Sequence, residues 1–95
     1  MMKKTALSLV LIAMASTAQA ACYADYKAKR DDPLKLHYGV IELSDDVCDD
    51  RKAARRQISD RLGANGWSLL KVQSIFDDRG LEERKESAGK FFLRF

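Results

Sequence analysis

The sequence predicts an α+β fold of two layers, in which one helix packs on a mainly antiparallel sheet of three to four strands. Residues 22–30 alternate apolar and polar side chains with the period of two that strands have. Residues 44–62 carry an apolar stripe at helical spacing, and residues 67–76 form an apolar run after an Asn-Gly turn. Because one apolar helix face must be covered by a sheet, the expected order is strand, strand, helix, strand, strand.

The first twenty residues resemble a cleaved secretory leader. Two lysines precede an apolar run at 6–15, and the small-residue pattern Ala-Gln-Ala at 18–20 suits the signal peptidase. The run is shorter than the roughly 20 residues that span a bilayer, which argues against a retained anchor. Gln19 stands where lipid attachment to Cys22 requires an aliphatic residue. We therefore expect general secretory export to the periplasm, with an extracellular location as the alternative, and one domain over 21–95.

The exported part has a nearly balanced charge, so it has no strong electrostatic field that would attract a charged partner. Of the 17 basic residues Lys3 and Lys4 lie in the leader, which leaves 15 against 14 acidic ones in 75 residues. A near-neutral domain has no field to recruit nucleic acid, so we expect no nucleic-acid partner and, after cleavage, no stable membrane anchor. The sequence contains no phosphate loop, dinucleotide fingerprint or zinc spacing. These observations predict a non-enzymatic protein without a cofactor or a bound metal.

The two cysteines, Cys22 and Cys48, are predicted to form a disulfide. Both lie in the exported part, and an even count in an oxidising compartment favours pairing. Closing a loop of this length stabilises a chain by roughly 3 kcal/mol in the chain-entropy model. A domain of this size has a marginal core and commonly needs such a cross-link.

The first two strands are expected to form a hairpin. Cys22, Ala24, Tyr26 and Ala28 share one side of the strand over 22–30. Residues 30–33, Arg-Asp-Asp-Pro, predict a turn, because the residue before proline avoids helical geometry. Residues 34–43 predict the second strand, which Gly39 weakens.

The central helix is expected to begin at Ser44-Asp45-Asp46, since these side chains cap helix N-termini and acids suit the positive end of the dipole. Its buried stripe is predicted to contain Val47, Ala54, Ile58 and Leu62. Gly63 is expected to end the helix in the left-handed conformation, and Asn65-Gly66 to turn the chain into the next strand.

The C-terminal third predicts two more strands. Residues 67–76 alternate, with Trp67 first, where its indole is expected to fill the gap beside the end of the helix. Residues 77–80 predict a turn, and the charged residues 81–89 a loop or an extended hairpin tip. Residues 90–95, Lys-Phe-Phe-Leu-Arg-Phe, predict a closing strand.

Two groups of side chains are candidates for catalysis or metal binding. Asp45, Asp46, Asp49 and Asp50 cluster around the helix start, and oxygen clusters of this kind bind calcium in some proteins. They lack the spacing, glycine and bidentate glutamate of a calcium loop, so capping explains them better. His37 is the only histidine, and no motif links it to a nucleophile. A small enzyme or metal binder using His37 and these acids is therefore an alternative hypothesis.

The leading hypothesis is a module that binds or modulates a protein partner. Cations of the helix, Arg51 and Arg55 among them, are candidates for an acidic partner. Aromatic side chains on the sheet face away from the helix would form an apolar patch; these are Tyr23, Tyr38, Trp67 and Phe92. The same patch supports a third hypothesis, a self-associating envelope protein that forms a homo-oligomer.

One stretch resembles a known family of small bacterial domains. Residues 62–70, Leu-Gly-Ala-Asn-Gly-Trp-Ser-Leu-Leu, are similar to the signature of domain-of-unknown-function family 4177, in which a helix ends in Leu-Gly before Gly-Trp and an apolar strand. Tyr26-Lys27 and residues 91–95 stand in comparable places, whereas the leader, the cysteines and the second strand are departures. The resemblance implies a compact α+β fold and carries over no catalytic residue. The matching positions are expected to be structural, namely Leu62, Gly63, Gly66, Trp67 and Leu69.

Overall fold

The computed structural model describes residues 21–95, and the predicted leader lies outside the described residues. These described residues form three strands and two helices in the order β1 (Cys22–Arg30), β2 (Lys35–Leu43), α1 (Arg51–Gly63), β3 (Ser68–Asp77) and α2 (Glu82–Ala88). Three short 3₁₀ helices connect them, at Asp45–Val47, Asp78–Gly80 and Gly89–Phe91. The predicted α+β class is confirmed. Within residues 21–95, no helix has the length and apolar character needed to cross a membrane.

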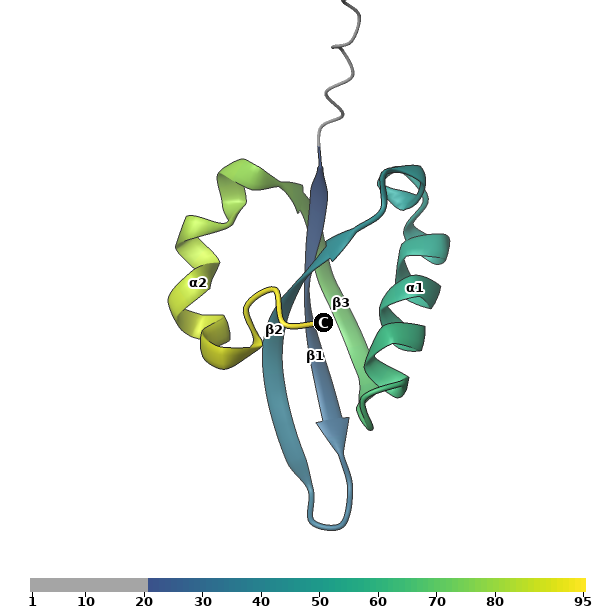
Figure 1. The fold of residues 1–95 in the computed structure, drawn as a ribbon, viewed down its shortest axis with the longest axis vertical. Coiled ribbons are helices and arrows are strands. Elements are labelled where there is room, and N and C mark those ends of the chain that lie inside the picture. The colour runs from purple at the N-terminus through teal and green to yellow at the C-terminus, as the bar shows by residue number, and fades with distance from the viewer. Residues whose placement is uncertain (1–20) are drawn as a thin grey trace, which may run out of the picture.

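The sheet has three strands in the order β2-β1-β3, and both pairings are antiparallel. The predicted hairpin of β1 and β2 is confirmed, with its turn at 31–34. Helix α1 packs on one face of the sheet and α2 lies over the other (Figure 1). The predicted two-layer arrangement with a single helix is therefore wrong, because the sheet is covered from both sides.

The last fifteen residues differ most from the prediction. Residues 82–88 form α2 rather than a loop, with Glu82 and Glu83 in the first turn, where acids complement the helix dipole. Gly89 then has φ of +56°, which ends the helix. Residues 89–95, here called the C-terminal strap, form no strand: Phe92 makes a single bridge to Val40 at the edge of β2. The predicted fourth strand is thus replaced by a strap that crosses the β2 edge.

The core lies between α1 and one face of the sheet. Ala24, Tyr26 and Ala28 are fully buried in β1, as their alternation predicted, and they face Ile58 and Leu62 of α1. Gly39 opposes Tyr26 across the hairpin, and a Cβ atom there would collide with the Tyr26 ring. Gly39, which was predicted to weaken β2, therefore makes room for Tyr26, the largest of the fully buried side chains.

Two β-bulges break the predicted alternation of β3. The register with β1 shifts between Asp25 and Tyr26 and again between Lys27 and Ala28. Each bulge inserts one extra residue and so exchanges the two faces of the strand. As a result the β3 residues opposite the buried side of β1 are spaced by three: Leu69, Val72 and Ile75. The same shift brings Ser74 opposite Asp25, on the face that α2 covers.

The ends of α1 lie elsewhere than predicted. The helix begins at Arg51, and Asp50 is its N-cap, with a side chain that accepts a hydrogen bond from the Ala53 amide at 3.0 Å. Residues 44–46, the expected start, lead instead into the separate 3₁₀ helix.

At the other end of α1, the left-handed residue is Gly66, with φ of +83°, and Gly63 is still helical. The Trp67 amide donates to the Leu62 carbonyl at 3.0 Å and the Gly66 amide to Gly63 at 3.1 Å. These two bonds form a Schellman motif, which requires positive φ three residues later than expected.

The predicted disulfide between Cys22 and Cys48 is present, with 5.9 Å between the two Cα atoms. It joins the first residue of β1 to the segment that connects the first 3₁₀ helix with α1. The bond therefore fixes the start of α1 against the end of the sheet where β1 begins.

Candidate functional site: a basic cleft beside the C-terminal strap

A cleft with a volume of about 650 Å³ lies between the hairpin, the end of α1 and the strap. Its lining combines aromatic rings with cations: Trp67, Phe91 and Phe95, and Arg30, Lys35, Lys90 and Arg94. Leu36 and Asn65 complete it, and no aspartate or glutamate side chain is among these lining residues. An aromatic surface ringed by four cations suits an anionic ligand with an apolar part.

Arg30 and Trp67 form one wall of the cleft. The Arg30 guanidinium lies 4.0 Å from the centre of the Trp67 ring, in cation–π geometry. It also donates hydrogen bonds to the carbonyls of Asn65 at 3.1 Å and Gly66 at 3.3 Å. Both carbonyls belong to the turn that ends α1. That turn therefore positions the side chain of Arg30, the last residue of β1. Trp67 is buried in this position beside the end of α1.

Behind this wall, His37 is the centre of an aromatic cluster. Its ring stacks on Phe91, with 3.7 Å between ring centres, and meets the edge of Trp67 at 4.3 Å. The Tyr26 hydroxyl lies 2.9 Å from Nε2, whereas buried Nδ1 has no hydrogen-bond partner among residues 21–95. Burial, together with the charge of Arg30, lowers the pKa of His37 to about 4. The imidazole is therefore neutral at pH 7 and acts as a packing surface for the strap.

Acid is expected to destabilise the protein through His37. The unfolded state takes up the proton near pH 6.5 and the folded state only near pH 4, so the free energy of unfolding falls as pH drops through this window. The loss by pH 5 is about 2 kcal/mol. Proton NMR of the imidazole should give a pKa near 4. The His37→Gln variant should lose stability less steeply between pH 7 and 5, and a measured pKa of 6 or above would contradict the assignment.

The strap is held near its middle and at its last residue. The Leu93 amide donates to the Val40 carbonyl at 2.8 Å, and the Arg61 guanidinium donates to the Phe95 carbonyl at 3.2 Å. Arg61 belongs to α1 and also donates to the Glu42 carbonyl of β2. Arg61 therefore links α1 to the strap and to β2, the edge strand opposite β3.

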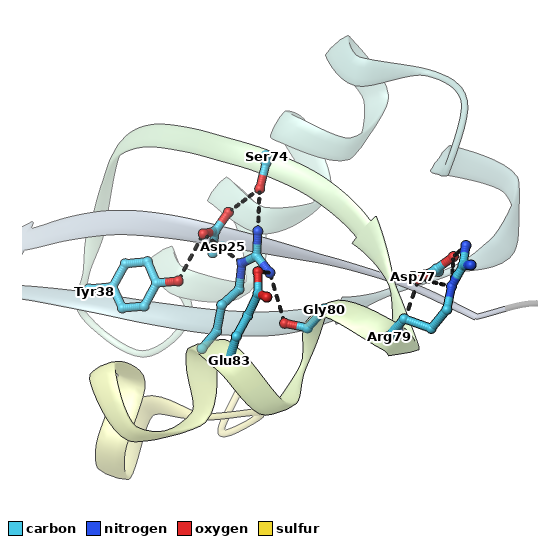
Figure 2. A network of polar contacts seen from close by, with 8 residues as sticks. Asp25, Tyr38, Ser74, Asp77, Arg79, Gly80 and Glu83 are labelled. Atoms are coloured by element: carbon cyan, nitrogen blue, oxygen red, sulfur yellow. Dashed lines mark hydrogen bonds and ion pairs between the residues drawn. The ribbon is translucent and has the colours of Figure 1, made fainter.

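The strap is also positioned from α2, through a buried ion pair on the opposite face of the sheet. Figure 2 shows Asp25 at the centre of a polar network under α2. Its carboxylate accepts hydrogen bonds from Ser74 at 2.6 Å, Tyr38 at 2.8 Å and Arg84 of α2 at 3.0 Å. The Arg84 guanidinium lies 4.0 Å from the centre of the Phe76 ring and donates to the Gly80 carbonyl at 2.8 Å. One arginine therefore attaches a seven-residue helix to β1 and β3, and Asp25 links it in turn to Tyr38 of β2.

The Asp25 carboxylate is charged in this network. Burial alone would raise its pKa, but the hydrogen bonds from Ser74, Tyr38 and Arg84 and the charge of Arg84 outweigh burial and hold the pKa below 3.8. Burial and the bond to Asp25 raise the pKa of Tyr38 to about 12. At neutral pH the network thus contains one carboxylate, one guanidinium and two neutral hydroxyl groups, all of them satisfied.

The residues predicted to form a partner surface do not gather on one face. Tyr23 is half-buried and stacks on Phe76, with 6.1 Å between ring centres, and Tyr38 is tied into the Asp25 network. Phe92 is half-buried at the edge of β2. Arg51 donates to the Val72 carbonyl of β3 at 3.3 Å, on the α1 side, and Arg55 is exposed beside it.

His37 and the four acids before α1 are not brought together either. His37 lies near the turn end of β2, and the acids follow the other end, about 20 Å away along an extended strand. Asp50 caps α1 and Asp46 accepts a hydrogen bond from Ser44 at 2.6 Å. Within residues 21–95, no three histidine, cysteine or acidic side chains are grouped closely enough to hold a metal ion.

Four of the five positions of the predicted structural motif lie in the packing or the turn around the end of α1, whereas Gly63 is an exposed helical residue. Leu62 and Trp67 are buried, Leu69 packs against the core, and Gly66 supplies the positive φ. Sequence reasoning missed the cations of the cleft and the pairing of Asp25 with Arg84. The two members of that pair are 59 residues apart, and no local pattern marks them.

No family model, curated protein or solved structure matches this chain.

Proposed function

We propose that this protein is an exported, non-enzymatic binding module that holds an acidic segment of a partner protein in the basic cleft. The observation that carries the proposal is the lining of the cleft, which has four cations, three aromatic rings and no acidic side chain. Tryptophan, other aromatic residues and arginine are the residue types enriched where proteins bind one another. Export to the periplasm is supported by the Cys22–Cys48 disulfide and by the leader-like sequence before residue 21.

The chemistry of the cleft favours a peptide over a nucleic acid. The exported part has nearly balanced charge, so its attraction is confined to the cleft and does not follow an extended backbone of phosphates. Lys35 and Arg94 are exposed and free to reach carboxylates at the rim, whereas Arg30 is held against Trp67. A segment with carboxylates on both sides of one aromatic residue would pair with the rim and place its ring against Phe91 or Phe95.

A titration with a synthetic peptide tests this proposal. The probe is a ten-residue peptide of glutamate and aspartate with one central phenylalanine; because it lacks tryptophan, Trp67 is the sole indole and reports binding by fluorescence. The double variant Lys35→Gln/Arg94→Gln is expected to weaken binding about tenfold, since rim charges contribute modestly. The matched control Arg56→Gln/Lys85→Gln removes two exposed cations outside the cleft and should bind like the wild type.

Three results would overturn the proposal. The first is absence of binding, and the second is equal weakening by the cleft variant and by its control. The third is a preference for a single-stranded oligothymidylate over the acidic peptide, which would indicate a nucleic-acid site. A peptide with glutamine and asparagine in place of the acids should not bind, because the cations would then have no partner.

A further inference from the structure

Exposed leucines gather at the end of the sheet that neither helix covers. Among residues 21–95, the most exposed large apolar side chains are Leu36, Leu34 and Leu70, at 66%, 63% and 47% exposure. Leu36 and Leu70 line one depression of about 310 Å³ together with Lys27. Leu34 lies in the turn of the same hairpin, which extends beyond both helices (Figure 1). We name the three leucines with Lys27 and Lys71 the leucine–lysine patch.

The two lysines of this patch stand directly opposite each other. Lys27 of β1 pairs in register with Lys71 of β3, and both are exposed. Like charges at opposite positions of an antiparallel pair repel each other. No carboxylate lies within ion-pairing distance of either lysine among residues 21–95, whereas neighbouring Lys29 is paired with Asp31 at 3.0 Å. The repulsion would be relieved by an anionic surface over this face of the sheet.

We propose that the leucine–lysine patch is a docking surface for an anionic lipid bilayer. Leucines that enter the interface and lysines that meet the headgroups are the combination with which proteins bind reversibly to membrane surfaces. A protein partner fits less well, because protein interfaces are depleted in lysine and enriched in aromatic residues. Two rings line the depression, and both are engaged within the fold: Tyr38 donates to Asp25, and His37 stacks on Phe91. Such contact is reversible and distinct from a membrane anchor.

The shape of the molecule allows this contact without rearrangement. The hairpin end is the extremity of the folded part, and both α1 and α2 begin or end short of it (Figure 1). Leu34 and Leu36 are therefore able to enter the interfacial region while the helices stay in water. The Asp25 network at the other half of the same face keeps α2 away from the patch.

Sedimentation with sucrose-loaded vesicles tests the proposal on the disulfide-bonded protein. We expect binding to vesicles of equal phosphatidylglycerol and phosphatidylcholine and none to phosphatidylcholine alone, at low salt. Lys27→Gln/Lys71→Gln should lower the partition coefficient about 25-fold, since each lysine contributes about fivefold. Leu34→Ser/Leu70→Ser should lower it about tenfold or more. The control Arg56→Gln/Lys85→Gln removes one exposed cation from each helix, and neither residue lines a depression with Leu70, so it should change the partition coefficient less than about twofold.

The outcomes separate this surface from the cleft. None of the four substituted patch residues lines the cleft, so the patch variants should bind the acidic peptide normally. Absence of binding to anionic vesicles, or equal loss in the Arg56→Gln/Lys85→Gln control, would overturn the lipid proposal and leave the cleft proposal intact. Equal binding to neutral vesicles would also overturn it, because the lysines would then contribute nothing. Capture of a protein through the patch without vesicle binding would assign it to a protein contact instead.

Discussion

Replacing Asp25 by alanine is expected to destabilise the protein by about 3 kcal/mol or more and to release α2 from the sheet. Removing one member of a buried ion pair leaves the other charge without its partner, which costs more than the pair itself contributes. Here Arg84 would remain beside Phe76 with its bond to Asp25 gone, and the hydroxyls of Ser74 and Tyr38 would lose their acceptor. The side chain of Asp25 is only 8% exposed, so water cannot fully replace the carboxylate.

Loss of the Asp25–Arg84 pair should disturb the cleft as well as α2. Helix α2 has only seven residues, and a helix of this length is not stable in isolation. Because it buries only Ala88, apolar packing alone gives it little support. When Arg84 releases it, the strap that follows is expected to detach, and Phe91 to leave His37 and Trp67. Amide hydrogen exchange should then accelerate in residues 82–95, and the emission of Trp67 should shift to the red.

A matched control distinguishes this ion pair from a surface one. Asp77 also pairs with an arginine, Arg79, at 2.6 Å, and Figure 2 shows the two carboxylates in the same view. The Asp77 pair is exposed, with 42% and 87% of its side chains accessible, and Asp77 also accepts a hydrogen bond from the Arg79 amide at 3.0 Å as the cap of a 3₁₀ helix. Asp77→Ala should therefore lower the melting temperature only slightly, and far less than Asp25→Ala. Equal effects of the two substitutions would contradict the role given to Asp25.

A double-mutant cycle measures the coupling itself. If Asp25 and Arg84 act as a pair, then Asp25→Ala/Arg84→Met should be less destabilised than the sum of the two single variants, because no unpaired charge remains. Additive effects would show that each residue contributes through other contacts, such as the packing of Arg84 on Phe76.

The sequence predicts the hairpin and the disulfide well because both have local or compositional signals. The alternation in residues 22–30 follows directly from a strand with one buried face, and two cysteines allow only one pairing. The end of α1 is predicted almost as well, since Leu-Gly and Asn-Gly mark a stop and a turn. Only the choice between Gly63 and Gly66 fails, because either glycine supplies positive φ without strain.

The C-terminal third is not predictable in the same way. Helix α2 has no apolar stripe that would mark it in the sequence. It is held on the sheet by Arg84, which pairs with the buried Asp25, and not by a row of apolar side chains. Asp25 itself lies among the polar alternating positions of β1, where a solvent-facing residue is the ordinary expectation. The Phe-Leu-Phe alternation at 91–95 indicates a strand, but Leu93 has φ of +55°, which turns the strap off the sheet edge. The cleft follows from these tertiary contacts and from the register, and it therefore has no sequence motif.

Removing the disulfide is expected to cost about 3 kcal/mol of stability without changing the cleft. The bond closes a loop over a separation of 26 residues, and in the chain-entropy model its loss enlarges the unfolded ensemble. For one small core of about 75 residues this is a large share of the total. Oxidised protein should therefore melt well above protein treated with reductant, and its mass should rise by that of two hydrogen atoms when the disulfide is reduced to two thiols. Unchanged mass would exclude the bond in solution.

The variant Cys22→Ala/Cys48→Ala separates stability from binding. Its melting temperature should match that of the reduced wild type and should not respond to reductant. The disulfide lies at the first residue of β1 and the cleft at the last, Arg30, roughly 26 Å away along an extended strand. Peptide affinity, measured by Trp67 fluorescence where the variant is still folded, should therefore equal that of the wild type. A parallel loss of affinity would mean that the start of α1 helps to shape the cleft, because Schellman carbonyls at its other end hold Arg30.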